Sequence, residues 1–368
     1  MAKLSEICTI NMGQSPESTT YNENGEGLPF FQGKADFGKI HPNVRVWCNA
    51  PKKIAHKNDI LISVRAPIGA LNVADSDCCI GRGLASLSVN NSVSVAEYIW
   101  YALESKVDYL ISMGTGSTFK AIGKNILFDL DIPLPPLEIQ YQIADNLDKV
   151  TQTINLCNAI LEKLDLLVKS RFVEMFYNTD DKRTIADICS IITDGTHQPP
   201  KFTQDGIPFL FVSNIVTNEI TYNAEKFISE ETYDELYKRT PIEIGDIVLS
   251  TVGSYGHPAV VKTNKKFLFQ RHIAYLKPIS SVVNSIYLHS AILSNDAQRQ
   301  IEERVKGIAQ KTLNLSEIRK ITVPIPPLAL QEQFAAFVEQ TDKSKLAVKQ
   351  VLEKAETLKK ALMQEYFG

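Results

Sequence analysis

Two long segments of the chain repeat apolar residues at steps of three and four, which is the spacing of one helix face. The first stripe comprises Ile143, Leu147, Val150, Ile154, Cys157, Leu161, Leu164, Val168 and Met175, with Arg171 interrupting it. The second, less regular stripe comprises Phe334, Val338, Thr341, Val348, Leu352, Ala355, Leu358 and Leu362. Each predicts a helix of about 40 residues, on the order of 60 Å long. Because neither helix can bury its stripe alone, we expect the two to pair antiparallel as a coiled coil.

A similar short string precedes each predicted helix. Residues 132–137 read Ile-Pro-Leu-Pro-Pro-Leu, and residues 323–328 read Val-Pro-Ile-Pro-Pro-Leu. Gln140 and Gln142 follow the first string, and Gln331 and Gln333 follow the second, so the offset stays at 191 residues from 132 to 323 and from 142 to 333. Proline is tolerated in the first turn of a helix. The chain is therefore predicted to be a duplicated unit of globular domain plus long helix.

The blocks before the two helices have the patterns of mixed α/β domains. Residues 59–64 form a short apolar run, residues 84–89 alternate, and residues 95–112 suit a helix. Several landmarks recur in the second block: Arg271 with Ala274 matches Arg82 with Ala85, and Gly307 with Lys311 matches Gly116 with Lys120. We therefore predict an α+β protein with a pseudo-two-fold internal repeat, with domains at 1–136 and 179–327 and helices at 137–178 and 328–368.

Composition adds mainly exclusions. The 368 residues carry a net charge of −3, so any nucleic-acid surface must be local. No apolar run approaches the roughly 18 residues of a membrane span, and the N-terminus lacks the apolar core of a signal peptide, so we expect a cytoplasmic protein. The six cysteines form no CxxC pair. GxGxxG, GxxxxGK[ST], HExxH and GxSxG are absent. We expect no catalytic residue, cofactor or metal; at Asp180-Asp181-Lys182 a solvated turn is favoured over a metal site.

The loops are the better candidates for chemistry. Residues 114–120 combine glycines, three hydroxyls and a lysine, groups that suit phosphate oxygens, and residues 306–312 keep the glycine and lysine. Gln and Asn side chains after the two Pro-Phe strands could read base edges, while arginines and loop histidines could contact bases or phosphates. Glycine-rich connectors, buried ion pairs and ordinary surface histidines remain the structural alternatives. The DNA-contact candidates are Gln32, Lys34, Arg65, Arg82, Thr115, Ser117, Thr118, Lys120, Thr196, His197, Asn214, Tyr255, Arg271, His272, Gln310 and Lys311.

With these residues in place, the chain resembles the specificity subunit of Type I restriction–modification systems over essentially its whole length. The similarity rests on residues 13–16 (Gly-Gln-Ser-Pro), 28–34 (Leu-Pro-Phe-Phe-Gln-Gly-Lys), 65–69 (Arg-Ala-Pro-Ile-Gly) and 114–120, and on both proline-rich helix starts. In the second domain, residues 193–197 (Thr-Asp-Gly-Thr-His) and 206–209 (Gly-Ile-Pro-Phe) are similar to another variety of the family's recognition domain.

The resemblance implies two target-recognition domains, each reading one half of an interrupted double-stranded DNA sequence, with the helices as spacers that fix the gap. Two methyltransferase subunits would dock along the helices, bring S-adenosylmethionine and flip out an adenine in each half-site. Restriction subunits would add ATP-driven translocation and cleavage. This chain would then be a non-catalytic subunit. The first domain begins almost at Met1, so we expect a compact version of the family.

Two other interpretations stay open from the residues alone. The chain could be a coiled-coil scaffold that joins two protein-binding modules, which predicts no salt-dependent DNA binding. It could also be the specificity portion of a self-contained restriction–methylation enzyme, which requires a methyltransferase fused to it or encoded beside it.

Overall fold

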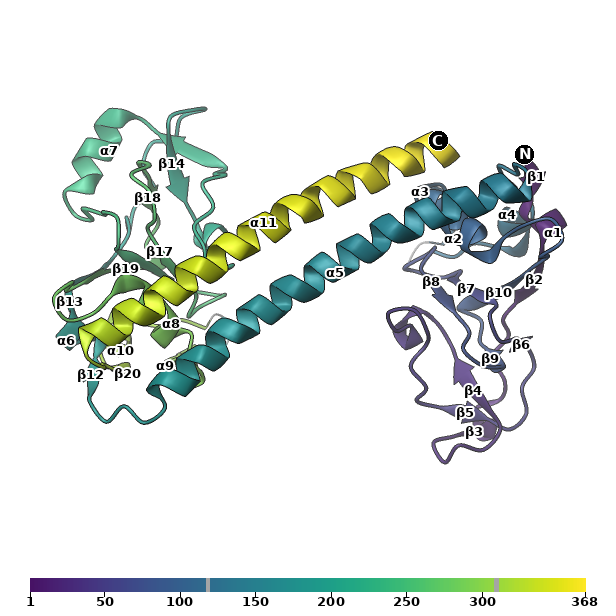
Figure 1. Cartoon of the computed structure of the whole chain (residues 1–368), viewed down its shortest axis with the longest axis horizontal. Helices are drawn as coiled ribbons and strands as arrows, with labels where there is room; N and C mark the ends of the chain where they lie inside the picture. Colours follow the sequence, from purple (N-terminus) through teal and green to yellow (C-terminus); the bar gives the residue numbers. More distant parts are fainter. Residues whose placement is uncertain (117–119, 308–310) are drawn as a thin grey trace. The chain divides into compact units, whose positions relative to one another are not determined.

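The computed structural model describes residues 1–116, 120–307 and 311–368, which form two compact units (Figure 1). Unit 1 comprises Met1–Asn158 and Gln350–Gly368, and unit 2 comprises Ala159–Lys349. Two helices of 40 residues each, α5 (Leu137–Phe176) and α11 (Leu328–Phe367), contribute a segment to both units. Each unit therefore contains a globular α+β part and a stretch of both long helices.

The core of unit 1 lies between an antiparallel sheet and helices. The sheet has the order β2 (Cys8–Met12), β10 (Leu84–Val89), β7 (Ile60–Ser63) and β8 (Leu71–Val73). Apolar side chains from these strands pack against α2 (Ala96–Ser105), α3 (Val107–Ser112) and the first turns of α5. The predicted helix over 95–112 is two helices, because the backbone departs from helical angles at Lys106 (φ −99°, ψ 5°).

A second sheet of unit 1 is mixed. It has the order β3 (Tyr21–Asn22), β5 (Trp47–Cys48), β4 (Leu28–Phe31), β9 (Cys78–Ile80) and β6 (Ile54–Ala55), with β4 and β9 parallel. A short pair, β1 (Ala2–Lys3) with β11 (Asp131–Ile132), ties the N-terminus to the segment before α5. The remaining short elements are α1 (Leu4–Ile7), η1 (Ser18–Thr20), η2 (Lys34–Asp36) and α4 (Lys124–Phe128).

Unit 2 repeats this plan, which confirms the predicted internal repeat. Its antiparallel sheet has the order β13 (Cys189–Asp194), β19 (Ile273–Pro278), β16 (Ile247–Ser250) and β17 (Pro258–Val260), and its mixed sheet has the order β15 (Lys226–Ile228), β14 (Ile207–Leu210) and β18 (Leu268–Phe269). Strands β12 (Lys182–Thr184) and β20 (Thr322–Pro324) pair as β1 and β11 do. The helical elements are α6 (Ile185–Ile188), η3 (Val212–Asn214), α7 (Glu230–Tyr237), α8 (Ser285–Ile292), α9 (Asn295–Arg304) and α10 (Leu315–Ile318).

The two long helices run antiparallel, as predicted. In unit 2, Lys345 Nζ on α11 lies 2.7 Å from Asp165 Oδ1 on α5, and the rings of Phe172 and Phe334 lie 5.6 Å apart. Residue numbers thus rise along one helix as they fall along the other. In unit 1, the Asn146 amide on α5 donates to the Tyr366 hydroxyl on α11 at 3.4 Å.

The predicted stripes lie on the buried face of both helices, but they leave out Phe172, Phe176 and Phe367, which are 3–7% exposed. Every predicted stripe residue of α5 is buried or half-buried, whereas Leu358 of α11 is 48% exposed. Lys359 points inward instead: its ammonium donates to Glu104 at 2.8 Å and lies 5.7 Å from the centre of the Tyr101 ring. A lysine can cover apolar surface with its methylene chain while its charge finds a partner. Hydrophobicity alone therefore assigned Leu358 instead of Lys359 to the buried face of α11.

Each long helix ends with a phenylalanine in a core. Phe176, the last residue of α5, packs against Phe334 and Tyr287 in unit 2, with ring centres 5.5 and 4.9 Å away. Phe367, the last residue of α11, is 3% exposed and its ring lies 5.3 Å from that of Tyr98 in unit 1. Both helix ends are therefore held by buried aromatic contacts.

Among the described residues, no helix combines the length and the apolar composition that a membrane span requires.

Candidate nucleic-acid interface

Strand ends in unit 1 bring Gln32, Arg65 and Arg82 together. Strands β7 and β10 pair up to Ser63 and Leu84, and the ladder continues with the Val64 amide, which donates to the Gly83 carbonyl at 2.9 Å. The Gly83 amide in turn donates to the Gln32 carbonyl at 3.1 Å, just after β4. Gln32, Arg65 and Arg82, which are far apart in sequence, therefore lie next to one another at one edge of the unit.

A short hairpin adds Lys120 to the same edge. Thr115 and Ala121 exchange backbone hydrogen bonds of 3.0 and 2.9 Å, and the Ala66 amide donates to the Lys120 carbonyl at 3.0 Å. The hairpin therefore lies directly beside the segment that carries Arg65. The predicted contacts Ser117 and Thr118 fall between Thr115 and Lys120, outside the described residues.

This edge of unit 1 is cationic and open to solvent. Gln32 and Thr115 are exposed, as are the cations Lys34, Arg65, Arg82 and Lys120. None of these four cations forms an ion pair with another residue in the described ranges, whereas nearby Arg45 is paired with Asp36. Unpaired, exposed cations retain their full attraction for an anionic ligand such as a phosphate backbone.

Unit 2 builds the corresponding edge with the same backbone hydrogen bonds. The Thr251 amide donates to the His272 carbonyl at 3.0 Å, and the Gly253 amide donates to the Lys311 carbonyl at 3.1 Å. Lys306 and Thr312 form the hairpin bridge that Thr115 and Ala121 form in unit 1. Arg271 therefore stands in the place of Arg82 and Lys311 in that of Lys120. Arg65, by contrast, is replaced by Val252.

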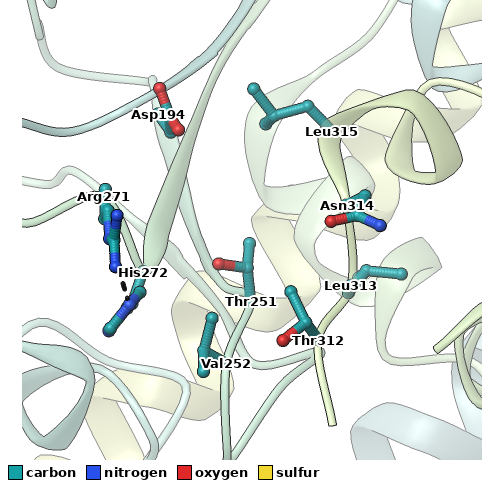
Figure 2. A pocket seen from close by; sticks show the side chains of 9 residues that line it. All are labelled: Asp194, Thr251, Val252, Arg271, His272, Thr312, Leu313, Asn314 and Leu315. Atoms are coloured by element: carbon teal, nitrogen blue, oxygen red, sulfur yellow. Dashed lines mark hydrogen bonds between the residues drawn. The ribbon is translucent and has the colours of Figure 1, made fainter. Parts of the chain in front are cut away.

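A cavity of about 440 Å³ lies at this edge of unit 2 (Figure 2). Arg271 and His272 stand on one side of it and Asn314 on the other. The Arg271 Nε lies 3.4 Å from His272 Nε2. Burial lowers the pKa of His272, and the Arg271 charge lowers it further, so the neutral imidazole is favoured at pH 7. The residues lining the cavity are Asp194, Thr251, Val252, Arg271, His272, Thr312, Leu313, Asn314 and Leu315.

The carboxylate of Asp194 makes the edge of unit 2 electrically mixed. It accepts a hydrogen bond from the Arg239 guanidinium at 2.7 Å, and the His197 imidazole lies 3.1 Å from the same oxygen. The predicted contact His197 is thus exposed but already partnered. Asp194 itself was missed, although it lies within the string of residues 193–197; Arg239 carried no signal in the sequence.

Lys311 is also partnered. Its ammonium lies 2.8 Å from Glu302 on α9 and 3.4 Å from the Tyr255 hydroxyl, which donates to the other oxygen of Glu302. The bond to Lys311 is the chief cause that lowers the pKa of Glu302, and the same bond raises the pKa of Lys311. The predicted residues Lys311 and Tyr255 thus come together around a carboxylate that no pattern in the sequence indicated.

Two other predicted contacts use their side chains inside the fold. Asn214 is 7% exposed; its side-chain oxygen accepts from the Phe211 amide at 2.9 Å, and its nitrogen donates to the carbonyls of Thr221 and Asn223, each at 3.2 Å. The Thr196 hydroxyl donates to the Phe269 carbonyl at 3.3 Å. Both therefore fix loop conformation. Gln310 lies outside the described residues.

Within the part of the chain that the structure describes, metal ligands do not gather and the cysteines are not exposed. No three His, Cys, Asp or Glu side chains within the described ranges are arranged to hold a metal ion. The cysteines are buried thiols, and burial raises the pKa of Cys8 to about 12, which disfavours the nucleophilic thiolate.

The sequence is similar to those of known restriction-enzyme subunits. The chain is 45% identical over 159 residues to the MjaX type I restriction enzyme specificity subunit of Methanocaldococcus jannaschii, a match covering 42% of this chain and 37% of that relative. It is 22% identical over 370 residues to the EcoBI specificity subunit of Escherichia coli, covering 92% of this chain and 78% of the relative.

A solved structure shares the whole fold. The crystal structure of the S subunit of a type I restriction–modification system from M. genitalium matches with a TM-score of 0.64 at 16% identity, covering 100% of this chain and 95% of that one. The family model described as the type I restriction modification DNA specificity domain matches twice, at residues 1–166 and 179–357. Both halves of the repeat are therefore accounted for, and the chain belongs to the type I restriction–modification DNA specificity family.

Proposed function

We propose that this chain is the DNA-reading specificity subunit of a type I restriction–modification complex, with each recognition domain binding one half of a bipartite target. The observation that carries the proposal is the duplicated edge, at which the same hydrogen bonds place Arg82 and Lys120 in unit 1 and Arg271 and Lys311 in unit 2. The edge of unit 1 is cationic and the edge of unit 2 is electrically mixed, and two equivalent edges with different side chains suit two half-sites of different sequence. A protein scaffold would have no need of them.

We assign the recognition domains to residues 1–136 and 179–327, and the spacers to residues 137–178 and 328–368. The spacer helices would fix the gap between half-sites and dock two methyltransferase subunits. Several apolar side chains are exposed on the two helices and would be available for that docking. Five of them, Tyr141, Leu156, Leu166, Leu346 and Val351, are 48–62% exposed.

The contacts divide by chemistry. Lys34, Arg65, Arg82, Lys120, Arg271 and Lys311 carry the charge that phosphates require, and Thr115, Ser117 and Thr118 add hydroxyl donors. Base edges fall to Gln32, His272 and Gln310, since amide and imidazole groups both donate and accept. The remaining candidates hold the loops in place through hydrogen bonds inside unit 2; they are Thr196, His197, Asn214 and Tyr255.

The chain itself would be non-catalytic. Methyl transfer from S-adenosylmethionine to an extruded adenine would belong to the methyltransferase subunits, and DNA translocation and cleavage to restriction subunits, in the cytoplasm. This division fits a chain whose cysteine thiols are buried.

A methylome tests the proposal. The chain is expressed with the methyltransferase encoded beside it in a host without adenine methylation, and modified adenines are mapped by long-read sequencing. We expect an interrupted two-part motif that disappears when this chain is omitted. No methylation, with both proteins present and associated, would contradict the proposed function, and methylation by this chain alone would contradict its non-catalytic role.

A further inference from the structure

The equivalent lysines of the two units have opposite surroundings. Lys311 is held by Glu302 and the Tyr255 hydroxyl, at 2.8 and 3.4 Å. Lys120 forms no ion pair with another residue in the described ranges. Counting back from the bridge that both hairpins share, Ile111 of unit 1 stands where Glu302 stands in unit 2. Counting on from Ala66 and Gly253 in the same way, Ile68 stands in the place of Tyr255.

From this asymmetry we infer that Glu302 is a specificity-determining residue that competes with DNA phosphate for Lys311. The inference rests on the proposed function, because it requires DNA at both edges. In unit 1 the lysine meets any DNA backbone as a free cation. In unit 2 a phosphate must first displace the carboxylate, so backbone contact alone binds that unit weakly. Discrimination in the second half-site then depends more on the groups around the cavity.

The contact has the properties that such competition needs. Glu302 and Lys311 keep 59% and 54% of their side chains exposed, so water screens the pair and a phosphate can reach it. Tyr255 donates to Glu302 and its ring lies 5.8 Å from the Lys311 ammonium. The pair is therefore ordered before DNA arrives but weak enough to exchange.

The experiment measures DNA affinity of the chain in complex with its methyltransferase subunits. Two unmethylated duplexes are used, one that contains the motif identified by the methylome and one that lacks it. Each is titrated with the complex at a series of salt concentrations. Glu302→Gln should tighten binding to the motif-free duplex about three- to tenfold at low salt and steepen the logarithmic salt slope by about one unit. Binding to the motif should tighten less, so the ratio of the two affinities falls.

Two variants isolate the mechanism. Glu303→Gln removes a neighbouring exposed carboxylate and controls for net charge. In a Lys311→Ala background, Glu302→Gln should lose most of its effect, because the competition acts through that lysine. An equal gain from Glu303→Gln, or a full gain without Lys311, would overturn the inference. Absence of salt-dependent binding by the unaltered complex would instead overturn the proposed function, and this inference with it.

Unit 1 offers the reciprocal test. Ile111 is 41% exposed, so a polar side chain there disturbs no buried packing. Ile111→Glu should capture Lys120 and weaken binding to both duplexes about three- to tenfold at low salt. Ile111→Gln, which has the same shape without the charge, should leave both affinities unchanged; an equal loss in the two variants would contradict the carboxylate's role.

Discussion

The side-chain oxygen of Gln140 lies 2.8 Å from the Ser94 hydroxyl, which donates to it. The same oxygen accepts from the Val95 amide at 3.1 Å, and the side-chain nitrogen donates to the carbonyls of Val93 and Pro135 at 3.1 and 2.8 Å. Gln140 is completely buried in the first turn of α5. It therefore locks the start of α5 to the loop before α2.

Replacing this amide should loosen the start of the helix. In Gln140→Leu, two carbonyls, one backbone amide and one hydroxyl lose their partner, and an unpaired buried polar group costs about 1–3 kcal/mol. We expect the free energy of unfolding to fall by about 3 kcal/mol, measured by chemical denaturation. Gln142→Leu, at an exposed position of the same helix, is the matched control and should change little.

The seam of α5, its stripe of buried apolar residues, can be tested by introducing one charged side chain. Leu147 is fully buried where α5 joins the core of unit 1, so Leu147→Asp places a carboxylate among apolar groups. We expect a loss of about 4 kcal/mol or more in the free energy of unfolding. Leu156→Asp, at a residue 62% exposed on the same helix, should be tolerated for folding. Equal melting temperatures for the two variants would contradict the seam.

Lys120 should contribute to affinity without reading sequence. Lys120→Ala removes an exposed cation that has no ion-pair partner among the described residues. We expect affinity for DNA with and without the motif to fall by similar factors, and the logarithmic salt slope to decrease by about one unit. Lys149→Ala is the control, since that lysine is exposed on α5 and pairs with Asp145. An unchanged salt slope in Lys120→Ala would exclude a phosphate contact there.

His272 predicts a pH dependence of binding. Burial and the neighbouring Arg271 hold its pKa below the ordinary value of 6.5, so the ring is neutral at pH 7. Protonation as the pH falls through that lowered pKa adds a positive charge to the edge of unit 2, and DNA affinity should rise by about two- to fivefold. Stability changes in the opposite direction to DNA affinity. Because the folded-state pKa of His272 is lowered, its protonation reduces the free energy of unfolding.

The measurement is DNA affinity as a function of pH, compared between the unaltered chain and His272→Gln. We expect His272→Gln to remove the gain at low pH. His197→Gln is the matched control at an exposed histidine that does not line the cavity, and it should retain the gain. A gain that survives in His272→Gln would assign the titration to another group.

Local sequence pattern predicted much of the fold. Apolar residues at helical spacing located α5 and α11, since a stripe such as Leu147 to Leu161 must be buried whatever surrounds it. The offset between Gln140 and Gln331 revealed the repeat, and both glutamines prove to be buried at equivalent helix starts. Leu358 shows the limit of this reasoning: its neighbour Lys359 gained a partner from α2, which hydropathy along one helix cannot anticipate.

The sequence by itself determined the duplication, the helices and the residue types available for binding, because these depend on the order of residues along the chain. Only the tertiary structure decided which of those residues act together. Gln32, Arg65, Arg82 and Lys120 became neighbours through backbone hydrogen bonds between distant segments. Asn214 turned inward, and Lys311 acquired Glu302, for the same reason: a side chain's partners are set by what packs beside it in space.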